Sequence, residues 1–142
     1  MEQLPVEALL ADYPPPMREI GEWLRGVVRR AVPTAIERVR PGWRLIGYDL
    51  PITGTRRTAY FAMIWAEPIH VHLGFEHGVL MTDTRGILLG AGITKQVRWV
   101  TLTPQTMQPE AHLAELVREA ARVACLSRGE RALLRSARIE AG

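Results

Sequence analysis

The sequence of 142 residues has little of what several classes of protein depend on. Its single cysteine, Cys125, has no partner within the chain, which excludes a disulfide scaffold. No stretch approaches the roughly 20 apolar residues of a membrane-spanning helix, so we expect no membrane partner. Hydrophobic residues make up 47% and charged residues 23%, which excludes a collagen-like or disordered chain. We therefore expect one compact domain over residues 1–142.

The chain also lacks asparagine and has one lysine, Lys95, although its formal net charge is +3. The other cationic residues are arginines, spread in short clusters such as Arg38–Arg40 and Arg56–Arg57. Proteins that bind nucleic acid usually concentrate positive charge on one face. We therefore attribute the arginines to genome composition and do not expect a nucleic-acid partner. The first residues are acidic and lack the pattern of an export signal, so we expect a cytoplasmic protein.

Apolar residues recur at helical spacing near both ends of the chain. The stripe over 17–31 predicts a helix, and 34–37 are expected to add a last helical turn. A shorter helix is predicted over 4–10, before a run of three prolines. A second long helix is expected from Pro109 to Ala124, followed by a weakly helical tail over 127–142.

The middle of the chain has the short apolar runs typical of strands. We predict strands over 43–50, 57–65, 69–75, 79–81 and 96–102, with a loop over 82–92. This order of elements predicts an α+β fold, a mainly antiparallel sheet of about five strands flanked by N-terminal and C-terminal helices.

The strands over 57–65 and 69–75 predict a hairpin around Glu67-Pro68. In the expected register, His70 lies opposite Trp65 and His72 opposite Met63. Because side chains alternate along a strand, five of them share one face. These are Phe61, Met63, Trp65, His70 and His72. Both faces of the hairpin are apolar and the helices can cover only one, so this second face is the candidate site.

Three interpretations of that face stay open. It is a second core closed by the tail or by another subunit, a pocket for a small molecule, or a metal site. His70 and His72 at i and i+2 are spaced by roughly 6.5–7 Å, which suits one transition metal. Iron or zinc usually takes three or four ligands, however, and histidines satisfied by hydrogen bonds are the alternative.

The loop over 82–95 is the second candidate. Its glycines followed by Thr94-Lys95 suggest phosphate binding, with Lys95 and Arg98 as the cations, but their order differs from that of a P-loop. Asp83 more often supports a turn. Cys125 fits a small core residue, and no carboxylate pair stands out, so we assign no catalytic residue and expect a protein that is not an enzyme.

A set of motifs gives a resemblance to a known family. They are Glu37-Arg38-Val39-Arg40-Pro41-Gly42-Trp43, Tyr48, His72-Leu73-Gly74-Phe75 and the loop from Asp83 to Gly92. Over roughly 16–124 the chain resembles the YdhG-like family of small bacterial proteins, some of which are called iron chaperones by analogy with frataxin. The resemblance implies an antiparallel sheet between terminal helices. Frataxin-like iron binding uses many carboxylates, and this chain has only three aspartates.

Together these patterns predict a non-enzymatic binding or chaperone-like domain. Its ligand site would combine Phe61, Met63, Trp65, His70 and His72 with Asp83, Lys95 and Arg98. The ligand would be a small molecule or a metal, with iron or zinc held by His70 and His72; no other cofactor is identified. The alternative is an interaction protein whose open sheet face forms a homodimer.

Overall fold

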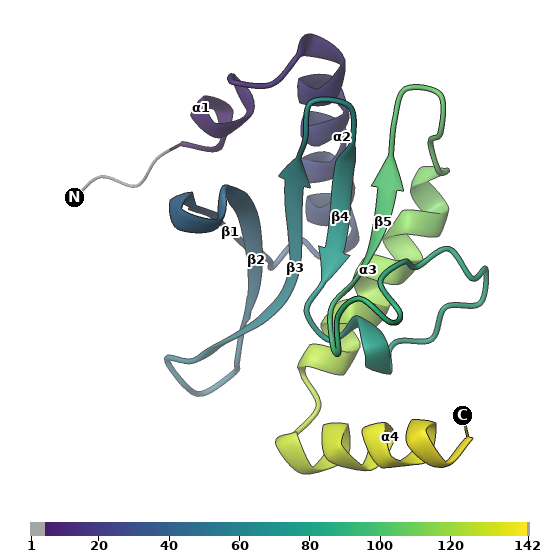
Figure 1. Cartoon of the computed structure of the whole chain (residues 1–142). Coiled ribbons are helices and arrows are strands. Elements are labelled where there is room, and N and C mark those ends of the chain that lie inside the picture. Colours follow the sequence, from purple (N-terminus) through teal and green to yellow (C-terminus); the bar gives the residue numbers. More distant parts are fainter. Residues whose placement is uncertain (1–4, 142) are drawn as a thin grey trace.

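The computed structural model describes residues 5–141 and has an α+β fold (Figure 1). Its helices are α1 (Val6–Leu10), α2 (Pro15–Ala31), α3 (Glu110–Ala124) and α4 (Arg128–Ala141). Its strands are β1 (Ile36–Arg40), β2 (Leu45–Pro51), β3 (Thr58–Ala66), β4 (Val71–Phe75) and β5 (Arg98–Leu102). Two short 3₁₀ helices are η1 (Pro41–Trp43) and η2 (Gly78–Leu80). In the described part of the chain, no helix has the length and apolarity to span a membrane.

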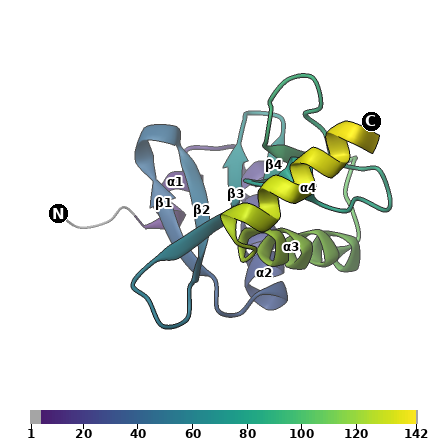
Figure 2. The ribbon, with the colours of Figure 1, turned by 90° about the horizontal axis from the view of Figure 1, so that it is seen from below.

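The five strands form one antiparallel sheet in the order in which they follow each other along the chain. Helices α2 and α3 lie side by side against the same face of this sheet (Figures 1 and 2). This arrangement confirms the predicted fold class. The opposite face, called the outer face below, is the one turned toward the reader in Figure 1.

Two of the predicted elements are wrong. Residues 34–37 do not extend a helix, because Ile36–Arg40 forms β1 at the edge of the sheet. Pro41 disfavours helical backbone at the residue before it, and the pairing with β2 determines the rest. The strand predicted over 79–81 is instead the single turn η2 followed by extended backbone. Leu80 and Met81 are buried in the core, so their apolar character reflects burial and not a strand.

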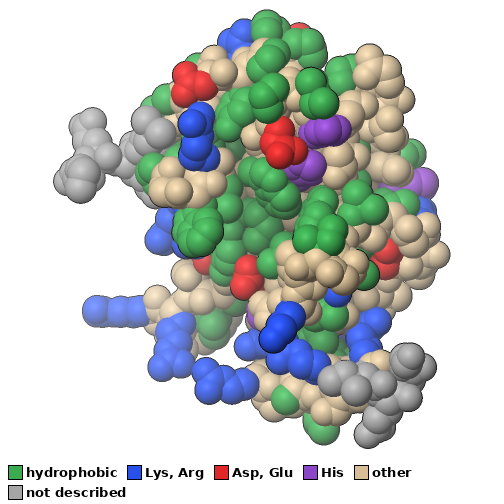
Figure 3. Space-filling view, viewed as in Figure 1, with side chains coloured by type: hydrophobic (Ala, Val, Ile, Leu, Met, Phe, Trp, Pro, Cys, Tyr) green, Lys and Arg blue, Asp and Glu red, His purple; other side chains and the backbone are tan. Residues whose placement is uncertain are grey.

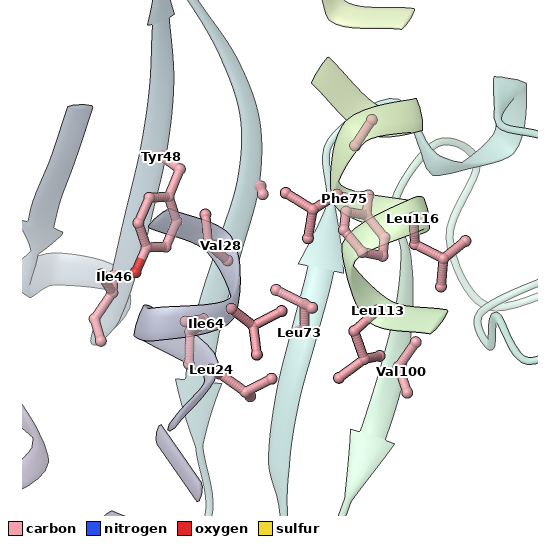
Figure 4. Packing of buried hydrophobic residues seen from close by; sticks show 14 of the residues in the cluster. Leu24, Val28, Ile46, Tyr48, Ile64, Leu73, Phe75, Val100, Leu113 and Leu116 are labelled. Carbon is pink, nitrogen blue, oxygen red and sulfur yellow. The ribbon is translucent and has the colours of Figure 1, made fainter. Parts of the chain in front are cut away.

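The core lies between the sheet and the two long helices (Figure 4). One row of buried side chains crosses all five strands, because the register pairs each member with the next. This row is Val39, Ile46, Ile64, Leu73 and Val100. Leu24 and Val28 of α2 and Leu113 of α3 cover it and are inaccessible to solvent. Each such side chain contributes about 1.5–3 kcal/mol by leaving water, so this layer is the main source of stability.

A polar network joins α2 to the sheet. Arg25 donates two hydrogen bonds to the carboxylate of Glu37, at 3.1 and 2.7 Å, and the Tyr48 hydroxyl donates a third at 2.7 Å. Burial alone would raise the pKa of Glu37, but the hydrogen bonds from Arg25 and Tyr48 outweigh it and hold the pKa below its usual value. The network explains why a glutamate occupies the second position of β1.

Helix α4 is the segment predicted as a weakly helical tail. It lies beyond one end of the strands and packs against η2, as Figures 1 and 2 show. Leu134 packs against the core, and Arg138 donates to the carbonyl oxygens of Leu80 and Met81 at 3.1 and 3.0 Å. The helix therefore covers the end of the sheet and leaves the outer face open.

Candidate functional site

The side chains of the outer face are set by a β-bulge in β3. Tyr48 pairs with Ala62, while the next residue, Asp49, pairs with Tyr60, so Phe61 is the extra residue. The bulge turns Tyr60 to the outer face and Phe61, which is 1% exposed, into the core. The prediction that Phe61 shares a face with Met63 and Trp65 is therefore wrong, because strict alternation does not hold across a bulge.

The β3–β4 hairpin has a different register from the predicted one. Trp65 pairs with His72 and Met63 with Gly74, two residues away from the expected pairing. The turn spans four residues, and the Glu67 N–H donates to the carbonyl oxygen of His70 at 2.8 Å. A shift of two residues preserves the faces, so Met63, Trp65 and His72 still lie together on the outer face.

His72 is held in a chain of three side chains. Its Nε2 lies 2.6 Å from a carboxylate oxygen of Glu67, and its Nδ1 lies 2.9 Å from the hydroxyl of Thr101 on β5. An ionised carboxylate can only accept, so in neutral His72 Nε2 donates and the Thr101 hydroxyl donates to Nδ1. The indole of Trp65 stacks on the ring at 4.8 Å. With both nitrogens bonded, His72 is a buried histidine satisfied by its neighbours, the alternative that the sequence left open.

The predicted metal pair is close in space but incomplete. The rings of His70 and His72 are 5.9 Å apart, and Glu67 lies between them, 3.7 Å from Nδ1 of His70. No group of three His, Cys, Asp or Glu side chains in the described residues is arranged to hold a metal ion. Figure 3 shows an acidic side chain against histidines on this face, surrounded by hydrophobic side chains.

Next to Met63 the outer face is hollowed. The hollow has a volume of about 220 Å³ and is lined by Arg40, Trp43, Leu45, Tyr60, Met63 and Glu76. Trp43 is 81% exposed because η1 carries it out of the sheet, and the chain then re-enters β2 through Arg44 in the left-handed conformation. Arg40 lies 4.3 Å above the Tyr60 ring and donates to Asp49 at 3.2 Å. One wall of the hollow is thus the cation–π pair of Arg40 and Tyr60, and the exposed indole of Trp43 is part of the same lining.

The environment of the hollow disfavours negative charge on two of its side chains. Burial raises the pKa of Tyr60 to about 12 and also raises that of Glu76. Arg40 opposes the burial effect at both groups but does not overcome it. The hollow therefore combines a neutral phenol with a guanidinium and a carboxyl group, on a surface that is otherwise apolar.

Two glycines give the large side chains of this face room to lie across the sheet. A Cβ on Gly74 would lie 2.6 Å from both the sulfur of Met63 and the ring of Trp65. A Cβ on Gly47 would lie 2.7 Å from Nε of Arg40 and 3.0 Å from the Tyr60 ring. Glycine at both positions therefore leaves room over the sheet for the side chains of Arg40, Tyr60, Met63 and Trp65.

The predicted loop residues do not gather at this face. Asp83 accepts hydrogen bonds from the N–H groups of Ile87 and Leu88, at 3.2 and 2.9 Å, which is a turn-supporting role. Lys95 is exposed, and Arg98 at the start of β5 donates to the carbonyl oxygens of Thr94 and Val97 in the preceding loop. The loop reaches the outer face through Leu89, which bridges Trp99 with two backbone hydrogen bonds.

The site that the structure assembles therefore differs in part from the predicted one. Met63, Trp65 and His72 belong to it, and His70 borders it. Sequence reasoning missed Arg40, Trp43 and Tyr60, because the position of Trp43 depends on η1 and that of Tyr60 on the bulge. Glu67, Trp99 and Thr101 were also missed, because each comes into contact only through the β3–β4–β5 register.

Comparison with known proteins adds no relative: no family model matches the chain, and neither a curated protein nor a solved structure does so. The resemblance to the YdhG-like family therefore stays a prediction from the motifs, and the function is argued from the geometry alone.

Proposed function

We propose that this protein is a binding domain that holds a small organic molecule in the hollow of its outer face. The observation that carries this proposal is the position of Trp43, whose indole is 81% exposed at the rim of a hollow lined by Tyr60 and Met63. A large apolar side chain in water costs free energy that a flat ligand would recover. Sites for small molecules are typically apolar with a few polar groups that fix orientation.

The lining determines the class of ligand. Trp43, Tyr60 and Met63 offer apolar and aromatic surface to a flat ring. Arg40 and Glu76 bring a guanidinium and a carboxyl group to the lining, and these can orient a ligand that carries one acceptor and one donor. The volume of about 220 Å³ suits a single ring system and not an extended chain.

Native mass spectrometry of the protein purified without denaturation tests this proposal. We expect a co-purifying small molecule with the parent protein and with Ile93→Ala, which removes another exposed apolar side chain, 76% exposed, from a loop. Trp43→Ala should lose it. Absence of any bound molecule in repeated preparations from different growth conditions would contradict the proposal.

A homodimer formed through the outer face is the second candidate. It is supported by other exposed apolar side chains near this face, Ile69 at 68% and Leu89 at 50%. In this case light scattering should give twice the monomer mass, and Trp65→Arg should produce the monomer. Leu133→Arg, an exposed position on α4, should leave the dimer intact. A parent protein that stays monomeric at high concentration would exclude this function.

Metal binding by His70 and His72 is the weaker form of the ligand proposal, because each nitrogen of His72 already has a partner. Elemental analysis of protein without a histidine tag decides it. Iron or zinc near one equivalent, lost on replacing both histidines by alanine, would support the metal, and its absence from the parent would rule it out.

A further inference from the structure

A second concave surface lies at the end of the sheet, between the β2–β3 hairpin and the junction of α3 with α4. This surface, called the basic groove, has a volume of about 850 Å³. The hairpin side includes Ile52 and Arg57, and the opposite side includes His77, Leu126, Arg128 and Arg131. Figures 1 and 2 show how the hairpin and the start of α4 approach each other there.

The charged side chains that line the basic groove are positive. Arg57, Arg128 and Arg131 line it, and the described lining residues include no aspartate or glutamate. None of these three arginines is paired with a carboxylate whose side chain the structure describes. Figure 3 shows Lys and Arg side chains gathered over the same end of the molecule. The basic groove therefore brings together three arginines that have no carboxylate partner among the described side chains.

One of these arginines is fixed in place. Arg131 donates through Nη1 to the carbonyl oxygens of Ala124 and Leu126, at 3.1 and 2.6 Å. These bonds fix the guanidinium over the α3–α4 junction. They use only Nη1, so the N–H groups of Nε and Nη2 are not engaged by them. A guanidinium already ordered by the protein loses less entropy when it binds an anion.

His77 reports on the same positive field. Its Nδ1 is buried and has no hydrogen-bond partner. Burial, followed by the charges of Arg131 and Arg135, lowers the pKa of His77. The charges of Arg131 and Arg135 act in the same direction at His77, which shows that the positive potential extends to this side of the basic groove.

Part of the remaining lining is apolar. Pro51, Ile52 and Ala59 form an apolar wall on the hairpin side, where Ile52 is 40% exposed, and Leu126 lies on the opposite side. Inorganic phosphate alone would leave this wall unused. A ligand that fits both parts has an organic body and a group with more than one negative charge.

We infer that the basic groove binds an organic phosphate of nucleotide size. Arginine forms paired hydrogen bonds with phosphate oxygens, and a volume of about 850 Å³ lies within the range of small-molecule sites. The inference does not depend on the hollow, with which the basic groove shares only Tyr60 among the described lining residues.

Isothermal titration of the full chain with ADP at low salt tests the inference, with adenosine and pyrophosphate as partial ligands. ADP should bind more tightly than either. Arg57→Gln and Arg128→Gln, both exposed and unpaired, should each weaken ADP about tenfold, the effect of one charge-assisted hydrogen bond. Arg118→Gln, an exposed arginine on α3 outside the basic groove, is the matched control and should bind like the parent.

Three outcomes would overturn the inference. They are no ADP binding by the parent, equal binding by the two groove variants and Arg118→Gln, or much tighter binding of a single-stranded oligonucleotide than of ADP. The last would identify a nucleic-acid surface instead. Trp43→Ala should bind ADP normally, which separates failure of this inference from failure of the proposed function. Circular dichroism confirms that each variant is folded.

Discussion

Replacing Glu37 by glutamine should lower the free energy of unfolding by about 2–3 kcal/mol. The side chains of Arg25 and Glu37 are only 11% and 15% exposed, and two hydrogen bonds join them. Glutamine keeps one acceptor oxygen in place. Its amide nitrogen, however, faces the second N–H of Arg25, so a charged pair becomes a clash of donors inside the protein.

The size of this loss of stability depends on the carboxylate partners that Arg25 retains. Removing one partner of a fully buried ion pair costs about 3–5 kcal/mol, because the other charge is left without compensation. Arg25 still has the carboxylates of Glu22 at 2.9 Å and Glu7 at 3.2 Å. Both are exposed and contribute at most about 1 kcal/mol each. Partial compensation therefore places the loss below the range for an isolated pair.

Urea unfolding at neutral pH measures this loss, since an unchanged slope means that a shift of the midpoint reports stability. Glu22→Gln is the control, because it removes an exposed partner of the same arginine and should cost less than about 1 kcal/mol. If Glu37→Gln costs no more than Glu22→Gln, the network is not a source of stability and the reasoning from burial is wrong.

The same pair predicts a pH dependence. The pKa of Glu37 is lower in the folded protein, so its contribution is complete above the unfolded value of about 4.3 and is lost as pH falls through the folded pKa. The difference in free energy of unfolding between the parent and Glu37→Gln should therefore shrink in acid. A gap that stays constant below pH of about 4 would show that charge is not what Glu37 contributes.

Two further changes test the outer face and the basic groove. Gly74→Ala places a Cβ 2.6 Å from two side chains of the outer face and should cost about 1–3 kcal/mol, whereas Gly42→Ala, with nothing within 4 Å, should be nearly neutral in the same urea assay. His77 has a lowered pKa in the fold, so its neutral form contributes stability above the unfolded pKa of about 6.5 that is lost as pH falls. His77→Gln should flatten the stability profile below this pH, and an unchanged profile would contradict the burial argument.

The parts of the fold that follow from the sequence are those in which one pattern repeats for long enough. The apolar stripe of α2 continues over several turns, and the runs within β3 and β5 are dense in aromatic and β-branched residues. β1 is different, because three of its five residues are charged. Its position depends on Arg25 and on pairing with β2, both of which are tertiary contacts that no local pattern contains.

The residues of the candidate site likewise fall into those that a local pattern predicts and those that depend on tertiary structure. Met63, Trp65 and His72 could be predicted because alternation holds on either side of one hairpin. Trp43 and Tyr60 could not be joined to them, since one depends on the short helix η1 and the other on the bulge at Phe61. The basic groove was hidden for a similar reason: Arg57 and Arg128 are far apart in the sequence, and their approach depends on where α4 packs.

The bulge at Phe61 links the stability of the core to the shape of the hollow. Without the extra residue, the Tyr60 ring would point into the core and Phe61 would face solvent, and the Tyr60 hydroxyl would need a buried partner. With it, the apolar Phe61 ring is buried and contributes about 2–3 kcal/mol, and Tyr60 is directed under the guanidinium of Arg40. The wall of the hollow is therefore held by the core residue next to it. The small-molecule function proposed above would benefit from this preorganisation, because a wall already in place loses little entropy on binding.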